Sequence, residues 1–273
     1  LGFSGAVTQA SADRNIAFVV GNSRYEKAEP LAHAQRDAAA IADRLRDPRR
    51  VRDATDRLIP DVAGDGVAHA DVIIEAIFEN ADAKRALFAA LERKAKPTAI
   101  LATNTSSIPL EDIATALTDP TRLIGLHFFN PVARMMLVEI VVGRQTQEAL
   151  VPRAAAFVRQ IDKLPLPVKS APGFLVNRIL APYLMAAMRA VDEGVAPEAV
   201  DEAALAFGMP MGPIELADTV GLDICVAVGK LLGDTGAPPR RLMELVDGGH
   251  LGRKTGRGFY AWVDGKPQKQ AAG

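Results

Sequence analysis

Short apolar runs alternate with amphipathic segments along the first half of the chain. The runs are nearly continuous in Val, Ile and Leu, which is typical of parallel strands covered by helices on both faces. Residues 81–95 instead repeat their apolar side chains at helical spacing, with Leu87, Phe88 and Leu91 on one face. This alternation predicts an α/β fold with a doubly wound, mostly parallel sheet. The predicted strands are residues 16–20, 71–77, 98–103, 123–129 and 137–142.

After about residue 170 the strand-like runs disappear and helical periodicity takes over. An apolar stripe at helical spacing includes Phe174, Ile179, Leu184 and Met188. This change of pattern predicts a second, smaller and all-α domain. We therefore expect a Rossmann-type domain over residues 1–169, a helical domain over residues 170–262, and a polar tail or linker over residues 263–273.

The chain opens with Leu-Gly-Phe-Ser-Gly, which matches the last five positions of a G-x-G-x-x-G dinucleotide-binding turn. In this interpretation the backbone at Gly2 approaches a pyrophosphate, and Gly5 lies where helix and strand pack closely. A helix-compatible segment, residues 6–14, then precedes the strand 16–20, as a βαβ unit requires. The first glycine and the strand before it are missing. Because that strand is central in such a sheet, its loss would leave unpaired backbone groups, so we expect a sheet lacking its first strand and a longer native chain.

Asn22 follows the strand 16–20, where NAD-binding sheets usually present an acidic residue to the adenosine ribose. An Asn side chain can accept one hydrogen bond but carries no charge, so the preference between NAD and NADP stays open. Alternatively, Asn22 caps a local turn.

Composition excludes several classes of function. With 32 basic and 33 acidic residues the net charge is −1, so no overall field attracts nucleic acid or an anionic membrane. No apolar stretch approaches the ~20 residues of a membrane span, and no signal peptide is recognisable. The single cysteine, Cys225, lies in an apolar run and fits a reducing, cytoplasmic compartment as a buried side chain. No spacing of Cys, His or acidic residues indicates a metal site.

One of the four histidines stands out as a candidate general base. His127 ends a predicted buried strand, where doubly wound sheets place their sites, whereas His33, His69 and His250 fall in polar or Gly-rich segments. Glu139 lies in another apolar run, and a carboxylate there is costly to bury unless it is paired. A His–Glu pair would satisfy both side chains, although a Glu facing water beside an unrelated core histidine is the alternative from composition alone.

Four strings of residues together resemble the L-3-hydroxyacyl-CoA dehydrogenase family over nearly the whole chain. They are TNTSSIPL at 103–110, GLHFFNPV at 125–132, MLVEIV at 136–141 and PGFLVNRIL at 172–180. The resemblance implies oxidation of an L-3-hydroxyacyl-CoA to the 3-ketoacyl-CoA with NAD, in fatty-acid β-oxidation. In the roles that it implies, His127 is the base, Glu139 orients it, and Ser106 and Asn177 contact the reacting oxygen.

The same resemblance implies further cofactor contacts. They come from the loop after the strand 71–77, from the loop that holds Ser106, and from two later positions: Ile77, Phe78, Glu79, Lys84, Ser106, Asn130 and Lys254. The CoA moiety would meet one or more of five arginines, Arg36, Arg44, Arg46, Arg49 and Arg50, among which the sequence does not choose.

Several strings, such as PMGPIELADTVGLD at 210–223, look most like the dehydrogenase section of multifunctional fatty-acid oxidation proteins. This resemblance implies a fused hydratase domain and a second helical domain in the native chain, or else a homodimer through the helical domain. Two alternatives for the function stay open. One is a non-enzymatic, structural member of the family, like a lens crystallin, and the other is a dehydrogenase of another hydroxy acid, such as 3-hydroxybutyryl-CoA or a sugar acid.

Overall fold

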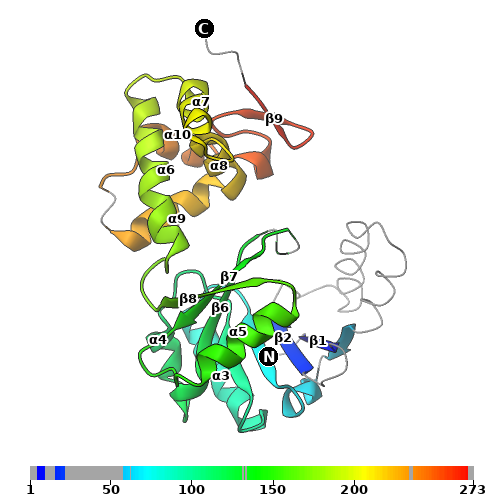
Figure 1. Cartoon of the computed structure of the whole chain (residues 1–273). Coiled ribbons are helices and arrows are strands. Elements are labelled where there is room, and N and C mark those ends of the chain that lie inside the picture. The colour runs from blue at the N-terminus through cyan, green and yellow to red at the C-terminus, as the bar shows by residue number, and fades with distance from the viewer. Residues whose placement is uncertain are drawn as a thin grey trace. The chain divides into compact units, whose positions relative to one another are not determined.

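The computed structural model of the chain describes residues 5–9, 16–21, 58–61, 63–130, 132, 134–233 and 236–269. The chain divides into two compact units, Leu1–Ala171 and Pro172–Gly273 (Figure 1). The first unit holds an eight-stranded sheet with helices, and the second holds helices and a small hairpin.

The sheet of the first unit has the strand order β3-β1-β2-β4-β5-β6-β7-β8. From β2 to β6 neighbouring strands run parallel, β7 is antiparallel to β6, and β8 is parallel to β7. All five strands predicted from the apolar runs are present, so the mostly parallel sheet is confirmed. The strands are β1 (Gly5–Gln9), β2 (Ile16–Gly21), β3 (Leu58–Asp61), β4 (Val72–Ala76), β5 (Ile100–Thr103), β6 (Leu123–Phe128), β7 (Leu137–Val142) and β8 (Leu164–Lys169).

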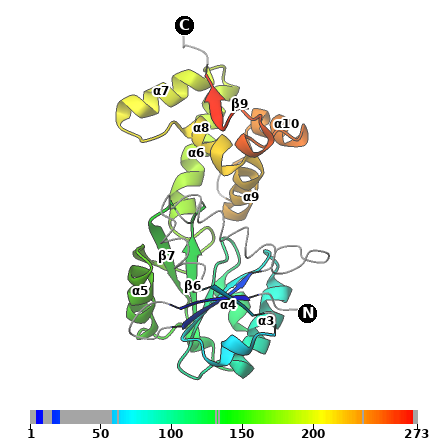
Figure 2. The ribbon, with the colours of Figure 1, turned by 90° about the vertical axis from the view of Figure 1, so that its right-hand side faces the viewer.

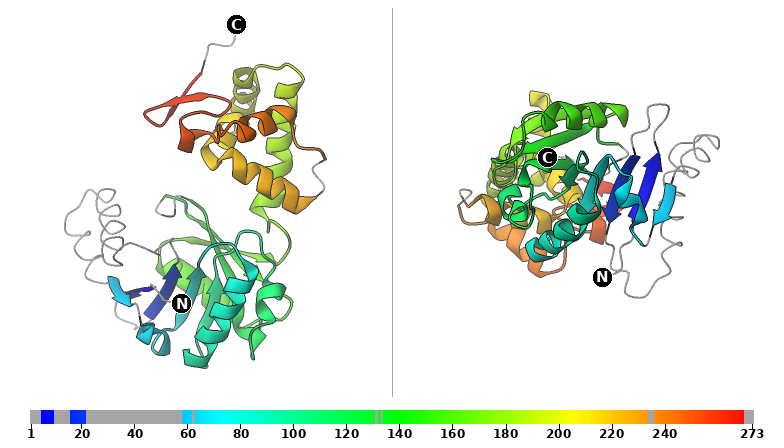
Figure 3. Two further views of the ribbon diagram at one scale, coloured as in Figure 1. Left: turned by 180° about the vertical axis from the view of Figure 1, so that it is seen from behind. Right: turned by 90° about the horizontal axis from the view of Figure 1, so that it is seen from below.

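The N-terminal edge of the sheet differs from the prediction. Residues 6–9 lie in β1, an antiparallel strand between β2 and β3, so the helix predicted there is wrong for these residues. Moreover, β2 pairs directly with β4, with Ala17 opposite Val72. Direct pairing gives the backbone groups of β2 and β4 partners, so the open row of unpaired groups expected from the sequence does not occur between them. Figure 3 shows β1, β2 and β3 side by side at this edge.

The sheet is covered on both faces by helices (Figure 2). Strand alternation directs Ile74, Leu126 and Ile140 into one core cluster with Phe157 of α5. The residues between them face the other way, toward the side of α3 and α4. The elements on the two faces are α3 (Ala81–Lys94), α4 (Leu110–Ala114), α5 (Leu150–Gln160), and the short turns η1 (Asp65–Ala68) and η2 (Pro120–Arg122).

The edge strand β8 has no counterpart in the predicted elements. Its sequence LPLPVK carries Pro165 and Pro167, which lack the N–H that a ladder uses, so its pattern does not resemble a central strand. Because β8 is the last strand of the sheet, only one of its sides has to form backbone hydrogen bonds, and that side pairs with β7.

The second unit is mainly helical, as predicted. In its first helix Leu184 and Met188 are buried, but Ile179 is 66% exposed, so the predicted apolar stripe is wrong at that position. The helix turns Ala181, Leu184, Met185 and Met188 inward at i, i+3, i+4 and i+7, and Ile179 falls outside this face. The elements are α6 (Val176–Asp192), α7 (Pro197–Phe207), α8 (Pro213–Val220), α9 (Leu222–Leu232), α10 (Arg240–Asp247), η3 (Arg253–Thr255), β9 (Ala261–Val263) and β10 (Lys266–Gln268).

Two buried carboxylates fasten the C-terminal hairpin to the helices. Asp218 accepts hydrogen bonds from the backbone N–H of Tyr260 at 2.9 Å and from the indole of Trp262 at 3.0 Å. Burial raises the pKa of Asp218, while these donors act in the opposite direction. Asp201 accepts from Lys269 at 2.9 Å. The polar tail predicted over 263–273 is therefore wrong for residues 263–269, whose strand pairing and ion pair join them to the unit, while residues 270–273 lie outside the described ranges.

Candidate active site

A histidine and a glutamate face each other on neighbouring strands of the first unit. His127 of β6 lies directly opposite Glu139 of β7, and the His127 Nδ1 atom is 2.7 Å from the Glu139 Oε2 atom. Opposite residues on antiparallel strands hold their side chains within contact distance, so the sheet register itself makes this pair. His127 is 6% exposed and Glu139 is fully buried. The predicted hydrogen bond between these two side chains is confirmed.

The carboxylate fixes the state of the imidazole ring. A carboxylate oxygen accepts hydrogen bonds, so His127 Nδ1 is the donor in this contact and Nε2 is the ring nitrogen that does not face Glu139. The ring of Phe129 packs against the imidazole with its centroid 4.6 Å away. A negative charge buried beside the ring stabilises the imidazolium. The pair is thus suited to take up a proton at Nε2 and to return it.

The loop after β5 reaches toward the same end of the sheet. The Asn104 Oδ1 atom accepts a hydrogen bond at 2.9 Å from the backbone N–H of Phe128, the residue after His127. Ser106 is exposed, two residues further along the loop. Because β4, β5 and β6 are parallel, the loops at their carboxyl ends lie along one edge, where sheets of this kind bind ligands.

Glu79 holds this loop in place. One oxygen, Oε1, accepts from the Thr105 hydroxyl at 2.5 Å and from the backbone N–H groups of Ser106 and Ser107 at 3.0 Å each. The Glu79 side chain is 35% exposed, and its second oxygen lies 3.4 Å from Lys84 Nζ. One carboxylate therefore joins the end of β4 to the loop that carries Ser106.

A fully buried ion pair underneath was missed by the sequence analysis. Glu75 of β4 accepts hydrogen bonds from Lys84 Nζ at 2.7 Å, from the Thr103 hydroxyl at 2.6 Å and from the backbone N–H of Ile77 at 2.6 Å. Glu75 is fully buried and Lys84 is 1% exposed. Lys84, for which the resemblance implies a cofactor contact, thus has its ammonium inside the protein, between Glu75 and Glu79. The sequence feature that could have indicated this ion pair is the glutamate inside the apolar run DVIIEAI at 71–77.

These contacts set the charge of Glu79. Partial burial acts to raise its pKa, but the hydrogen bonds from Thr105 and Ser107 and the charge of Lys84 together hold the pKa below the ordinary value. A lowered folded-state pKa contributes stability that is present above the unfolded-state pKa and is lost as the pH falls through the folded-state value.

Glu79→Gln is accordingly expected to lower the free energy of unfolding by roughly 1–2 kcal/mol near neutral pH, after allowance for solvent screening. The difference from the unchanged protein should shrink as the pH falls below the ordinary glutamate pKa and through the lowered folded-state value, because the carboxylate of the unchanged protein is then protonated too. Denaturant unfolding at a series of pH values measures it. Asp82→Asn, on the exposed side of α3, is the control, and an equal loss in that variant would contradict a special role for Glu79.

The other predicted cofactor residues fall into three groups. Ile77, Phe78 and Asn130 follow β4 or β6 at the same edge as Ser106, and Phe78 is 55% exposed. Gly5 begins β1 and pairs with Val20, so it has strand geometry rather than that of a turn before a helix. Gly2, Asn22 and the five arginines between 36 and 50 lie outside the described residues.

Two predicted site residues belong to the second unit. Asn177 is half-buried in the first turn of α6, where it lines a hollow between helices. Lys254, in η3, donates to both carboxylate oxygens of Asp223 at 2.6 Å. The side chain of Lys254 is exposed, and its ammonium group is paired with a carboxylate of the same unit, that of Asp223.

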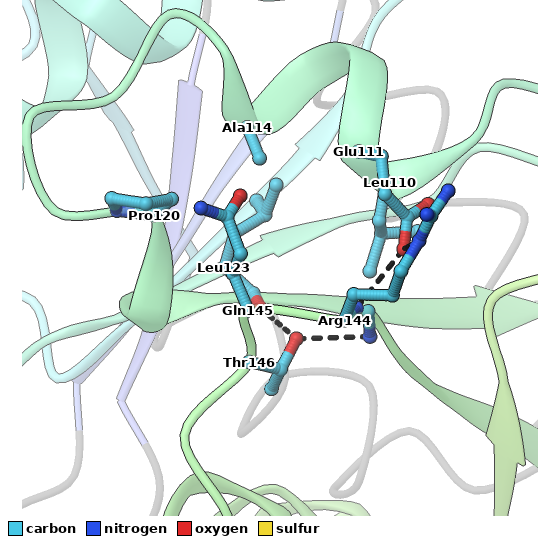
Figure 4. Close-up of a pocket in the computed structure, with 9 residues that line it drawn as sticks. Leu110, Glu111, Ala114, Pro120, Leu123, Arg144, Gln145 and Thr146 are labelled. Carbon is cyan, nitrogen blue, oxygen red and sulfur yellow. Dashed lines mark hydrogen bonds and ion pairs between the residues drawn. The ribbon is translucent and has the colours of Figure 1, made fainter.

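A separate hollow lies at the opposite end of β6 from His127 (Figure 4). Its polar groups are bonded to one another: Thr146 donates to the carbonyl of Leu123 at 2.7 Å, and Glu111 accepts from the backbone N–H of Arg144 at 3.0 Å. Because it lies at the other end of β6, it is not part of the candidate site.

Over the described ranges, no cluster of His, Cys, Asp and Glu has an arrangement that could hold a metal ion. None of the helices in those ranges is both long enough and apolar enough to cross a bilayer.

Comparisons with known proteins match both units. Residues 2–171 match the family described as 3-hydroxyacyl-CoA dehydrogenase, NAD binding domain, and residues 173–262 match its C-terminal domain. A probable 3-hydroxybutyryl-CoA dehydrogenase of Bacillus subtilis (strain 168) is 38% identical over 267 residues, covering 94% of this chain and 93% of that protein. The fatty acid oxidation complex subunit alpha of Vibrio campbellii is 42% identical over 204 residues, covering 73% of this chain and 29% of that protein. The crystal structure of M. tuberculosis FadB2 matches with a TM-score of 0.82 at 34% identity over 90% of each chain.

Proposed function

Because the chain belongs to the 3-hydroxyacyl-CoA dehydrogenase family and is an NAD-dependent enzyme, we propose that the buried His127–Glu139 pair is its catalytic centre. The observation that carries this proposal is the 2.7 Å contact between His127 Nδ1 and Glu139 Oε2. Oxidising a secondary alcohol requires a base for the hydroxyl proton, and the Nε2 atom of a ring oriented in this way is such a base. NAD, when bound, accepts the hydride from carbon.

In the proposed site, Ser106 and Asn177 hydrogen-bond the oxygen at C3 of the substrate. A hydroxyl and an amide can each donate to that oxygen as it becomes a carbonyl. The exposure of Ser106 and the fixing of its loop by Glu79 support its part. His127 returns its proton to the same oxygen in the reverse, reducing direction.

The described residues fit the nicotinamide half of NAD. Glu79 Oε2, which does not hold the loop, is proposed to accept from ribose hydroxyls, and Ile77, Phe78 and Asn130 to border the ring. Lys84 acts through Glu79 from inside the protein, and Lys254 is proposed to reach the cofactor by leaving Asp223. Gly2 and Asn22 stay proposed contacts of the adenosine and pyrophosphate half, whereas Gly5, which pairs in a strand, does not.

The proposed reaction is the oxidation of an L-3-hydroxyacyl-CoA to the 3-ketoacyl-CoA in β-oxidation. The similarity to the fatty acid oxidation subunit supports it, whereas the Bacillus relative favours a four-carbon 3-hydroxybutyryl-CoA. An absorbance assay of reduced nicotinamide with acetoacetyl-CoA tests the function, with NADH and NADPH compared. We expect turnover with NADH, and no turnover with either cofactor would refute the proposal.

For partners, we propose that the helical unit associates with a second helical unit. This additional helical unit would come from another copy of the chain or from a fused domain, as the similarity to the multifunctional subunit suggests. Light scattering of the purified chain distinguishes a dimer from a monomer.

A further inference from the structure

The ammonium group of Lys84 is surrounded by oxygen atoms of its own unit. It lies 2.7 Å from Glu75 Oε1, 3.3 Å from the carbonyl oxygen of Ile77 and 3.4 Å from Glu79 Oε2. A lysine ammonium has three N–H donors, and these oxygens match that number. Because Lys84 is buried, its ammonium could contact a bound ligand only by leaving at least one of them. The arrangement favours an indirect role for Lys84.

Glu75 is the closer and the more firmly fixed of the two carboxylates beside Lys84. It is fully buried, and it also accepts hydrogen bonds from the Thr103 hydroxyl and from the backbone N–H of Ile77, both at 2.6 Å. Glu79 is farther away and partly exposed. Attraction between charges is stronger where water is excluded. The ammonium of Lys84 is therefore held mainly by Glu75.

The two oxygens of Glu79 have different surroundings. Oε1 accepts the hydrogen bonds of the loop after β5, which come from the Thr105 hydroxyl, the backbone N–H of Ser106, and both the backbone N–H and the hydroxyl of Ser107. Oε2 faces Lys84 at the longer ion-pair distance. If the ammonium moved fully onto Oε2, it would occupy the oxygen that the loop leaves open to a ligand.

We propose that Glu75 is a positioning residue for the carboxylate of Glu79. Its charge keeps the Lys84 ammonium back, so that Glu79 Oε2 stays available to the nicotinamide ribose. The inference rests on the proposed function, in which this oxygen accepts from ribose hydroxyls. When Glu75 loses its charge, Glu79 is left as the carboxylate beside Lys84, and an ion pair between those two side chains competes with the ribose.

Fluorescence titration with NADH, in the absence of any substrate, tests the proposal. Glu75→Gln keeps an acceptor oxygen but removes the charge. Its Kd for NADH is expected to rise about tenfold, which corresponds to one hydrogen bond to a charged group. In the reduction of acetoacetyl-CoA, the KM for NADH should rise similarly. The kcat at saturating NADH should change by less than about threefold, because Glu75 does not touch the reacting atoms.

Asp71→Asn is the matched control. Asp71 lies just before β4, at the other end of the strand that carries Glu75, and pairs with a lysine of its own, Lys96, at 2.9 Å. Removing this carboxylate should leave both the Kd and the KM for NADH unchanged.

A double variant distinguishes the positioning role from a direct contact. Combining Glu75→Gln with Lys84→Met removes the competing ammonium, so the Kd for NADH should return to within about threefold of the unchanged protein. A direct contact between Lys84 and the cofactor predicts a Kd higher than that of Glu75→Gln alone. The double variant buries no unpaired charge, so it also serves as the test if Glu75→Gln does not fold.

The outcomes separate this inference from the proposed function. Tight NADH binding that Glu75→Gln does not weaken, or that the double variant does not restore, would overturn the positioning role and leave the proposed function standing. An unchanged protein that binds no NADH would remove both.

Discussion

Replacing His127 by Gln is expected to lower kcat for acetoacetyl-CoA reduction by roughly 10²–10⁴, the usual contribution of a general acid–base group. Gln has nearly the same reach and can keep a hydrogen bond to Glu139, so the strands β6 and β7 should stay paired. It cannot carry the proton between the substrate oxygen and solvent. Because the proposed role of His127 is proton transfer at the reacting oxygen, KM should change much less than kcat. Steady-state kinetics with NADH gives both constants.

Two companion variants make the result specific. His69→Gln changes an exposed histidine of the same unit and should leave kcat unchanged. Glu139→Gln should lower kcat less than His127→Gln does, because an amide oxygen can still accept the Nδ1 hydrogen but no longer stabilises an imidazolium. If His127→Gln retained more than half of the original kcat, His127 would have no part in the chemistry.

The second large effect is expected at the buried ion pair under the site. Lys84→Met leaves the carboxylate of Glu75 without its cation in a fully buried position, and breaking such a pair commonly costs about 3–5 kcal/mol. For a domain of this size that loss lowers the thermal midpoint by on the order of 10 °C. Differential scanning calorimetry measures the shift.

A double variant separates charge from packing. Combining Lys84→Met with Glu75→Gln removes both charges while Gln can still accept from Thr103, so most of the stability should return. Lys96→Met breaks the partly exposed pair with Asp71 and should cost less than about 1 kcal/mol. A Lys84→Met variant as stable as Lys96→Met would mean that Glu75 takes up a proton at little cost.

The apolar periodicity predicted most of the fold because it reflects burial directly. The strands β2, β4, β5, β6 and β7 are short apolar runs, and the helix at 81–94 has one apolar face. Elements whose residues are atypical were missed, such as β8 with its two prolines. Residues 6–9 were assigned to a helix through the motif before them, but in the structure they pair in a strand with β2 and β3. The pairing with β3 joins segments far apart in the sequence, which local pattern does not contain.

The sequence predicts the part of the site that contains Glu139, because a buried carboxylate needs a partner, but the same argument was not applied to Glu75. A carboxylate in an apolar run must find a partner, and this reasoning led from Glu139 to His127. The same reasoning applied to Glu75 would have indicated a buried cation, and Lys84 would have been recognised as its partner. The role of Glu79 in holding the Ser106 loop could not be predicted, because it depends on how two loops meet at the sheet edge.

The indole that donates to Asp218 also has a spectroscopic consequence. Trp262 is the one tryptophan in the sequence, and its ring is 9% exposed in the second unit. Tryptophan emission from this protein therefore reports on the helical unit, and a red shift of the emission maximum signals the release of the C-terminal hairpin into water. Circular dichroism records both units together. If the tryptophan emission and the circular dichroism changed at different temperatures in one melting experiment, the two units would unfold in separate steps. The temperature at which the emission changes would then show whether the helical unit unfolds first.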